Sequence, residues 1–223
     1  MKNLILIILI VLFTSCISKK SALKEKEPKS LVQLKLASDT LTTEEKNIVN
    51  DFLDVELASE RYKNDLNREI IVIEEASNGI ENLEVYEYAY KRFHEYGAKP
   101  TTEVKERLGW ILDTIQIKGL KNNYGDKKQY HWRSSDIKNF KVNIMTKEVF
   151  TNNIRSGEYI TLPERLIIYI TKPLLVDSTT AFTTFRTGSS RLGFTTMNNY
   201  TALMNKVNGK WLIRASYWDG SIE

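Results

Sequence analysis

The sequence contains one cysteine, Cys16, and two histidines, His94 and His131, among its 223 residues. A single cysteine cannot form a disulfide within the chain, so burial and hydrogen bonding must stabilise the fold. Zinc sites use several Cys and His ligands, and the sequence also has no H-E-x-x-H or D-x-D-x-D-G pattern. We therefore expect neither a metal nor another cofactor.

Proline, glycine and long apolar runs are also scarce. Four prolines and ten glycines are few for this length, which argues against long disordered regions in the main domain. The longest apolar run, residues 4–13, is ten residues long, whereas a helix needs about 20 to cross a bilayer. Neither sign of charge dominates, with 32 Lys and Arg against 28 Asp and Glu. Nucleic-acid binding needs basic residues clustered on one face, so we expect no nucleic-acid partner.

The apolar run begins after Lys2 and ends in two small residues, Thr14 and Ser15, directly before Cys16. A positive charge followed by an apolar run of this length is typical of a signal peptide. The pattern resembles the lipobox of bacterial lipoproteins, with Phe13 where that family usually has Leu. The resemblance implies that Cys16 is acylated and becomes the mature N-terminus. An ordinary signal peptide with a chance cysteine is the alternative.

This resemblance implies an order along the chain and a location. Residues 1–15 would be the signal peptide, 16–39 a lipidated tether, and 40–223 a single domain. The tether is rich in Lys and Ser and has too little apolar surface to order itself, so we expect it to be flexible. The protein would be held to a membrane of the cell envelope through Cys16, and we expect the outer membrane, facing the periplasm.

Helical patterns occupy the first half of the domain. Thr42 and Glu45 form a capping box that predicts a helix over residues 43–59. Further helices are predicted over 80–93 and from a cap at Thr101 or Thr102 to Gly119, the latter with its apolar residues, Ile115 included, turned inward. Residues 69–76 contain four β-branched residues in succession, and their pattern leaves strand and helix both open.

Strand patterns occupy the second half, over residues 140–144, 166–171, 179–187, 192–207 and 210–218. Asn208-Gly209 predicts a two-residue type I′ turn between the last two. Strict alternation places Trp211, Ile213, Ala215 and Tyr217 on one face of the final strand. Helices before strands predict an α+β domain, with N-terminal helices packed on one face of a curved antiparallel sheet.

Helices followed by a meander resemble the cystatin-like and nuclear-transport-factor-2-like cone folds. Residues 130–218, with the strand that ends in Lys172-Pro173 and the hairpin around Asn208-Gly209-Lys210-Trp211, also resemble small lipoproteins of Bacteroidota-type bacteria. The first resemblance implies a cone-like sheet. The second resemblance carries no known active site.

The densest polar patch is residues 131–136, where His131 and Asp136 flank Ser134 and Ser135. These residue types can perform acid–base or nucleophilic chemistry. However, no G-x-S-x-G elbow is present, and closeness in sequence is not the geometry of a triad. We expect a loop in which a serine caps a turn, and we expect replacement of His131 or Asp136 by Ala to leave the protein folded.

Other candidates have structural explanations that we favour. His94 ends a predicted helix, where a cation interacts favourably with the last carbonyls. Glu74 and Glu75 are neighbours whose side chains point apart, as on a solvated face. A cone-shaped sheet can also open a pocket lined by aromatic side chains, although core packing is the preferred reading for Tyr86, Tyr88, Tyr90, Trp211, Tyr217 and Trp218.

The sequence thus favours an envelope-anchored lipoprotein with a non-enzymatic binding or structural domain. Its partner besides the membrane would be a protein, a glycan or a small molecule. One alternative is a cone-fold enzyme that uses His131 as base and Asp136 as orienting group in a pocket. Another is an immunity-type protein, which rests on size and location by analogy.

Overall fold

The structure is a computed structural model that describes residues 40–62, 68–76, 79–94, 110–123, 129–191 and 198–218. All described residues belong to one unit, Val32–Glu223. The predicted signal peptide, Cys16, the tether up to residue 39 and the start of the third predicted helix lie outside the described residues.

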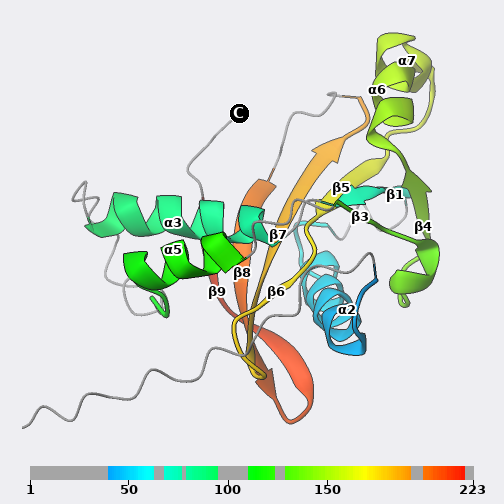
Figure 1. Ribbon diagram of the computed structural model, residues 1–223. Coiled ribbons are helices and arrows are strands. Elements are labelled where there is room, and N and C mark those ends of the chain that lie inside the picture. The colour runs from blue at the N-terminus through cyan, green and yellow to red at the C-terminus, as the bar shows by residue number, and fades with distance from the viewer. Residues whose placement is uncertain are drawn as a thin grey trace, which may run out of the picture. The chain divides into compact units, whose positions relative to one another are not determined.

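The described part of this unit is an α+β domain with a mixed sheet (Figure 1). The strand order is β4-β1-β5-β7-β8-β9, and β6 pairs with β7. These strands are β1 (Ile70–Ile73), β4 (Val142–Met145), β5 (Leu166–Ile170), β6 (Leu174–Leu175), β7 (Thr180–Ser189), β8 (Asn198–Val207) and β9 (Lys210–Trp218). β1 runs parallel to β4 and β5, whereas the other pairs are antiparallel. The prediction of an antiparallel sheet is therefore wrong for β1.

The open question about residues 69–76 is settled in favour of strands. All four residues of β1 are buried, because the strand lies between two partners and is covered on both faces. Ile70 and Val72 belong to one apolar cluster, and Ile71 and Ile73 to another. The next residues form β2 (Glu75–Ala76), which pairs with β3 (Tyr130–His131) in a separate two-stranded sheet.

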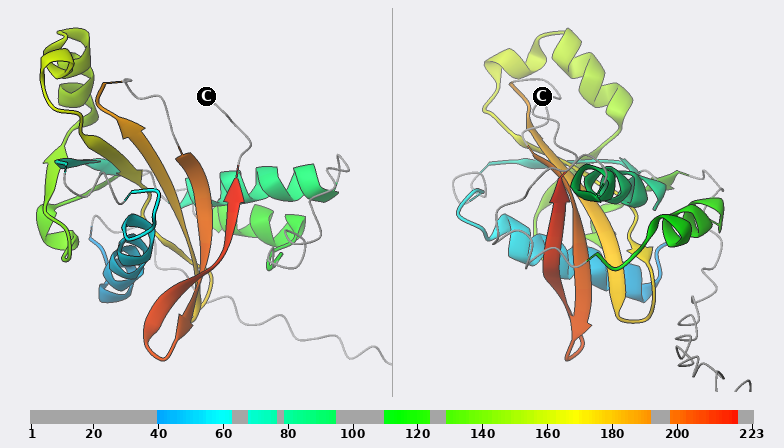
Figure 2. Two further views of the ribbon diagram at one scale, coloured as in Figure 1. Left: turned by 180° about the vertical axis from the view of Figure 1, so that it is seen from behind. Right: turned by 90° about the vertical axis from the view of Figure 1, so that its left-hand side faces the viewer.

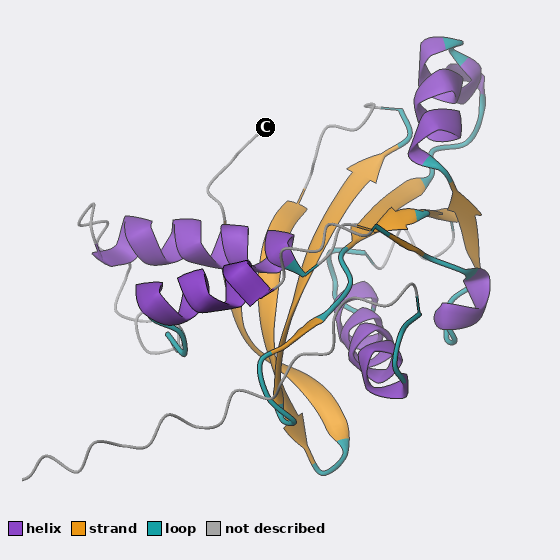
Figure 3. Ribbon diagram, viewed as in Figure 1, coloured by secondary structure: helices purple, strands orange, loops and turns teal. Residues whose placement is uncertain are grey.

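Helices cover both faces of the main sheet (Figures 2 and 3). α2 (Thr43–Leu57) packs on one face through Ile48, Phe52 and their neighbours. On the other face, α3 (Ile80–His94) and α5 (Thr114–Asn123) pack near β7 to β9. α6 (Lys147–Arg155) and α7 (Glu158–Thr161) cover β1 and β5 on that face. The prediction that helices occupy a single face is therefore wrong.

The capping box predicted at Thr42 is present. The Thr42 hydroxyl accepts from the Glu45 N–H at 3.1 Å, and the Glu45 carboxylate accepts from the Thr42 N–H at 2.7 Å. The predicted start of the third helix, at Thr101 or Thr102, lies outside the described residues. Within the predicted range, a reciprocal pair of bonds between Asp113 and Gln116 starts α5 at Thr114. α5 then continues through Gly119, and Ile115 is 81% exposed instead of turned inward.

The predicted turn between β8 and β9 is confirmed, because Asn208 (φ 51°) and Gly209 (φ 82°) both have positive φ. The predicted alternation along β9 fails after this turn. Met204 pairs with Ile213 but Leu203 pairs with Ala215, so the strand carries a β-bulge. The extra residue reverses the faces. Trp211 and Ile213 pack on the α2 side of the sheet. Ala215 and Tyr217, which were predicted to share their face, instead pack with the apolar residues of α3 and α5.

Candidate functional site

Asp136 ends the 3₁₀ helix η1 (Ser134–Asp136), and its side chain is only 2% exposed. One carboxylate oxygen forms an ion pair with Lys46 Nζ at 2.8 Å. The other accepts hydrogen bonds from the Tyr130 hydroxyl at 2.7 Å and from the Arg133 N–H at 3.1 Å. This carboxylate therefore joins α2, β3 and η1, and it is occupied by structural bonds.

The electrostatics of this group agree with its contacts. Burial raises the pKa of Asp136, but the bonds from Lys46, Tyr130 and the Arg133 backbone outweigh burial and hold that pKa below its ordinary value. Burial and the Asp136 charge raise the pKa of the Tyr130 hydroxyl well above its ordinary value. At neutral pH Asp136 is thus a carboxylate and Tyr130 a proton donor to it. These contacts indicate that Asp136 stabilises the domain, so we expect its replacement by Ala to lower the free energy of unfolding.

His131 lies on the exposed side of β3, with 56% of its side chain accessible. Its Nδ1 is 3.1 Å from the Glu74 carboxylate. The structure therefore gives His131 and Asp136 different partners and does not assemble them as a base and its orienting group. Ser134 and Ser135 are exposed residues of η1.

The remaining candidates also have structural contacts. Glu75 accepts a hydrogen bond from the Lys147 N–H at 2.7 Å, at the first residue of α6. The His94 ring lies against Tyr90 and Trp110, with centroids 4.2 and 5.4 Å apart. Among the described residues, no group of three or more His, Cys, Asp or Glu side chains is arranged to hold a metal ion.

Of the aromatic candidates, Tyr86, Trp211 and Tyr217 are buried in the core, whereas Tyr88 is 46% and Trp218 45% exposed. The Tyr86 ring packs against Trp110, Phe182 and Tyr217, with centroids 5.6, 5.0 and 4.8 Å apart. The Tyr86 hydroxyl bonds both the N–H and the carbonyl of Leu112 at 3.1 Å. Burial raises the pKa of Tyr86 to about 12, so this hydroxyl stays protonated at neutral pH.

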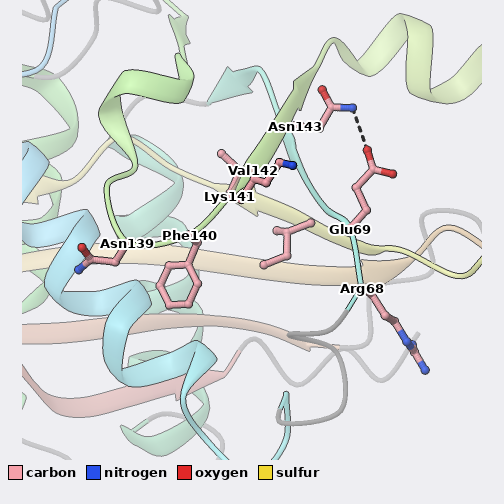
Figure 4. A pocket seen from close by; sticks show the side chains of 8 residues that line it. Arg68, Glu69, Asn139, Phe140, Lys141, Val142 and Asn143 are labelled. Carbon is pink, nitrogen blue, oxygen red and sulfur yellow. Dashed lines mark hydrogen bonds between the residues drawn. The ribbon is translucent and has the colours of Figure 1, made fainter.

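The structure has a hollow of about 520 Å³ where β1 and β4 begin (Figure 4). We call it the β1–β4 hollow, and its lining residues are Arg68, Glu69, Ile70, Asn139, Phe140, Lys141, Val142 and Asn143. Ile70, Phe140 and Val142 also pack with the core cluster on the α2 side, so the hollow has an apolar wall. Its volume is in the range of small-molecule sites.

The charged groups around the β1–β4 hollow differ in how fully they are paired. Glu69 accepts from Arg165 at 2.6 Å and from Asn143 at 3.1 Å. Arg68 forms an ion pair with Glu164 at 3.0 Å. The Lys141 ammonium group makes no hydrogen bond or ion pair with any described residue, so it is available to a ligand. The hollow therefore offers an ammonium group to an anionic ligand such as a carboxylate.

Sequence reasoning missed this site because its two halves lie about seventy residues apart along the chain and meet through the parallel pairing of β1 with β4. The alternating pattern of residues 140–144 did identify Lys141 and Asn143 as polar positions of a strand. Nothing in that pattern indicates that Arg68 and Glu69 lie beside them.

Comparison of the chain with family models, curated proteins and solved structures finds no match in any of the three. Within the described residues, no helix combines the length and apolar character needed to cross a bilayer. The function must therefore be inferred from the chemistry of the chain itself.

Proposed function

We propose that the protein is a bacterial envelope lipoprotein, held to the membrane through acylated Cys16, whose α+β domain binds a ligand. One observation carries this proposal: the only cysteine directly follows a ten-residue apolar run and two small residues. A diacylglycerol on the thiol and an acyl chain on the new amino group give several buried chains. Two or more chains anchor stably, whereas one holds only marginally.

In this proposal, residues 16–39 span the distance from the membrane to the domain, and the outer membrane facing the periplasm is the location. The β1–β4 hollow is the proposed binding site, and Lys141 is its charged recognition residue. We also propose that β7, β8 and β9 curve as in a cone-like sheet. The enzyme alternative lacks support from geometry, since the partners of Asp136 are structural and His131 is exposed.

Replacement of the cysteine tests the anchor. Cys16→Ala removes the thiol that accepts the lipid, so we expect unprocessed precursor or protein released from the membrane. The matched control is Ser15→Ala, which keeps a small residue beside an intact cysteine. Partitioning between detergent and aqueous phases, together with the size of the product, distinguishes the two variants. A Cys16→Ala protein that is still processed and partitions like the wild type would contradict the proposal.

A further inference from the structure

The hairpin of β8 and β9 has an unusual charge composition. Between Asn198 and Trp218 it contains Lys206, Lys210 and Arg214 but no Asp or Glu. β7 stops pairing with β8 at the pair Thr180–Asn205, so the end of the hairpin, residues 206–211, extends beyond β7. Figures 1 and 2 show this end projecting from the sheet.

One face of the projecting hairpin is matched by carboxylates of α2. Lys206 Nζ lies 2.7 Å from the Glu44 carboxylate, which also accepts from the Trp211 indole N–H at 2.6 Å. Asp51 accepts from the Trp211 backbone N–H at 2.8 Å. Together these contacts fix the hairpin against α2 and neutralise the positive charge on that face.

On the opposite face of the hairpin, no carboxylate of the described residues neutralises the positive charge. The register pairs Val207 with Lys210 and Asn205 with Leu212, which places the two apolar residues diagonally on one face. Val207 is 48% exposed and Leu212 is 45% exposed. Lys210 and Arg214 are exposed, and no described carboxylate lies within ion-pair distance of either. The result is a protruding face with exposed apolar and cationic side chains.

We propose that this face of the hairpin, defined by Val207, Lys210 and Leu212 and flanked by the exposed Arg214 at the bulge, docks on the surface of an anionic lipid bilayer. Cationic side chains are attracted to acidic headgroups, and neighbouring apolar side chains bury themselves at the boundary with the acyl chains. The charge of the face is complementary to such a surface. The proposal rests on the hairpin and does not require that Cys16 is acylated.

The test uses the full chain reconstituted in vesicles, with Cys16→Ala so that an introduced cysteine is the only thiol. An environment-sensitive fluorophore is attached at Val207→Cys. The matched control carries the same fluorophore at Ile115→Cys, an exposed aliphatic position on α5. Vesicles of phosphatidylcholine alone are compared with vesicles of equal parts phosphatidylcholine and phosphatidylglycerol.

We expect the fluorophore at position 207 to brighten and shift to shorter wavelength with phosphatidylglycerol only, while that at position 115 stays unchanged. Lys210→Glu or Arg214→Glu should remove most of the signal, and raised salt should weaken it. Lys118→Glu, the same charge reversal on α5, should leave it intact. Circular dichroism verifies that each variant is folded.

Equal responses at positions 207 and 115, or a response to neutral vesicles, would overturn the proposal. So would a signal that survives both hairpin charge reversals in folded protein. A response to soluble poly-glutamate without one to vesicles would assign the face to an acidic protein instead. Because every chain in this test lacks Cys16, its outcome is independent of the lipid anchor.

Discussion

At the scale of single residues, Asp136 shows how a polar group that resembles a catalytic one can be structural. The Asp136 carboxylate is bonded by Lys46, Tyr130 and the Arg133 backbone. The backbone carbonyl of Asp136 accepts a hydrogen bond from the Asn50 side chain at 2.8 Å. Its closeness to His131 in sequence is visible, but Lys46 and Asn50 are about ninety residues away and no local pattern reveals them.

Replacement of this carboxylate should destabilise the domain. Asp136→Ala leaves the Tyr130 hydroxyl and the Arg133 N–H without their acceptor, and we expect a loss of about 2–4 kcal/mol in the free energy of unfolding. His131→Ala is the control, because its exposed pair with Glu74 contributes about 0–1 kcal/mol. Urea unfolding of both variants measures the difference. If the two variants were equally stable, the buried contacts of Asp136 would not be what stabilises the domain.

The stabilisation that the Asp136 carboxylate provides should depend on pH. The pKa of Asp136 is lower in the folded protein than its ordinary value of about 3.9. Its contribution to stability is therefore complete above that ordinary value and is lost as the pH falls through the lower, folded-state pKa. The stability gap between wild type and Asp136→Ala should be constant near neutral pH and should narrow below about pH 4.

At the scale of elements, local signals were sufficient where a few neighbouring residues decide the structure. Thr42 with Glu45 predicted the start of α2, and Asn208-Gly209 predicted the last turn. The β-bulge in β9 could not be predicted from the sequence, because it depends on the register in which β9 pairs with β8. The start of α6, where Thr146 accepts from the Val149 N–H at 3.2 Å, was a local signal that sequence reasoning missed.

The β1–β4 hollow makes a prediction at this scale. Benzoate, a carboxylate on an apolar ring, should bind weakly there, with its charge at Lys141. Titration into ¹⁵N-labelled protein should shift the backbone resonances of residues 68–70 and 139–143 above others. Benzamide, which has the same ring without the charge, should have a smaller effect.

Variants of two nearby lysines control this measurement. Lys141→Ala should abolish the preference for benzoate, whereas Lys138→Ala, an exposed lysine outside the lining, should retain it. Shifts spread evenly over the protein, or equal effects of the two variants, would show that the hollow is not a carboxylate site.

At the scale of the whole molecule, the α+β class followed from the order of patterns, but the layering did not. The periodicity of a helix identifies its apolar side without indicating which face of the sheet it will cover. One signal was available: the continuous apolar run of β5 is typical of a strand buried on both faces. The parallel pairing of β1 has no local signature, since it joins segments far apart in sequence.

The mass of the N-terminal tryptic peptide of the mature protein tests whether Cys16 is the lipidated N-terminus. We predict that this peptide begins at Cys16, ends at Lys19, and carries a diacylglycerol on the thiol. A chain that begins at any other residue, or a Cys16 with a free thiol in protein purified from its native membrane, would contradict it.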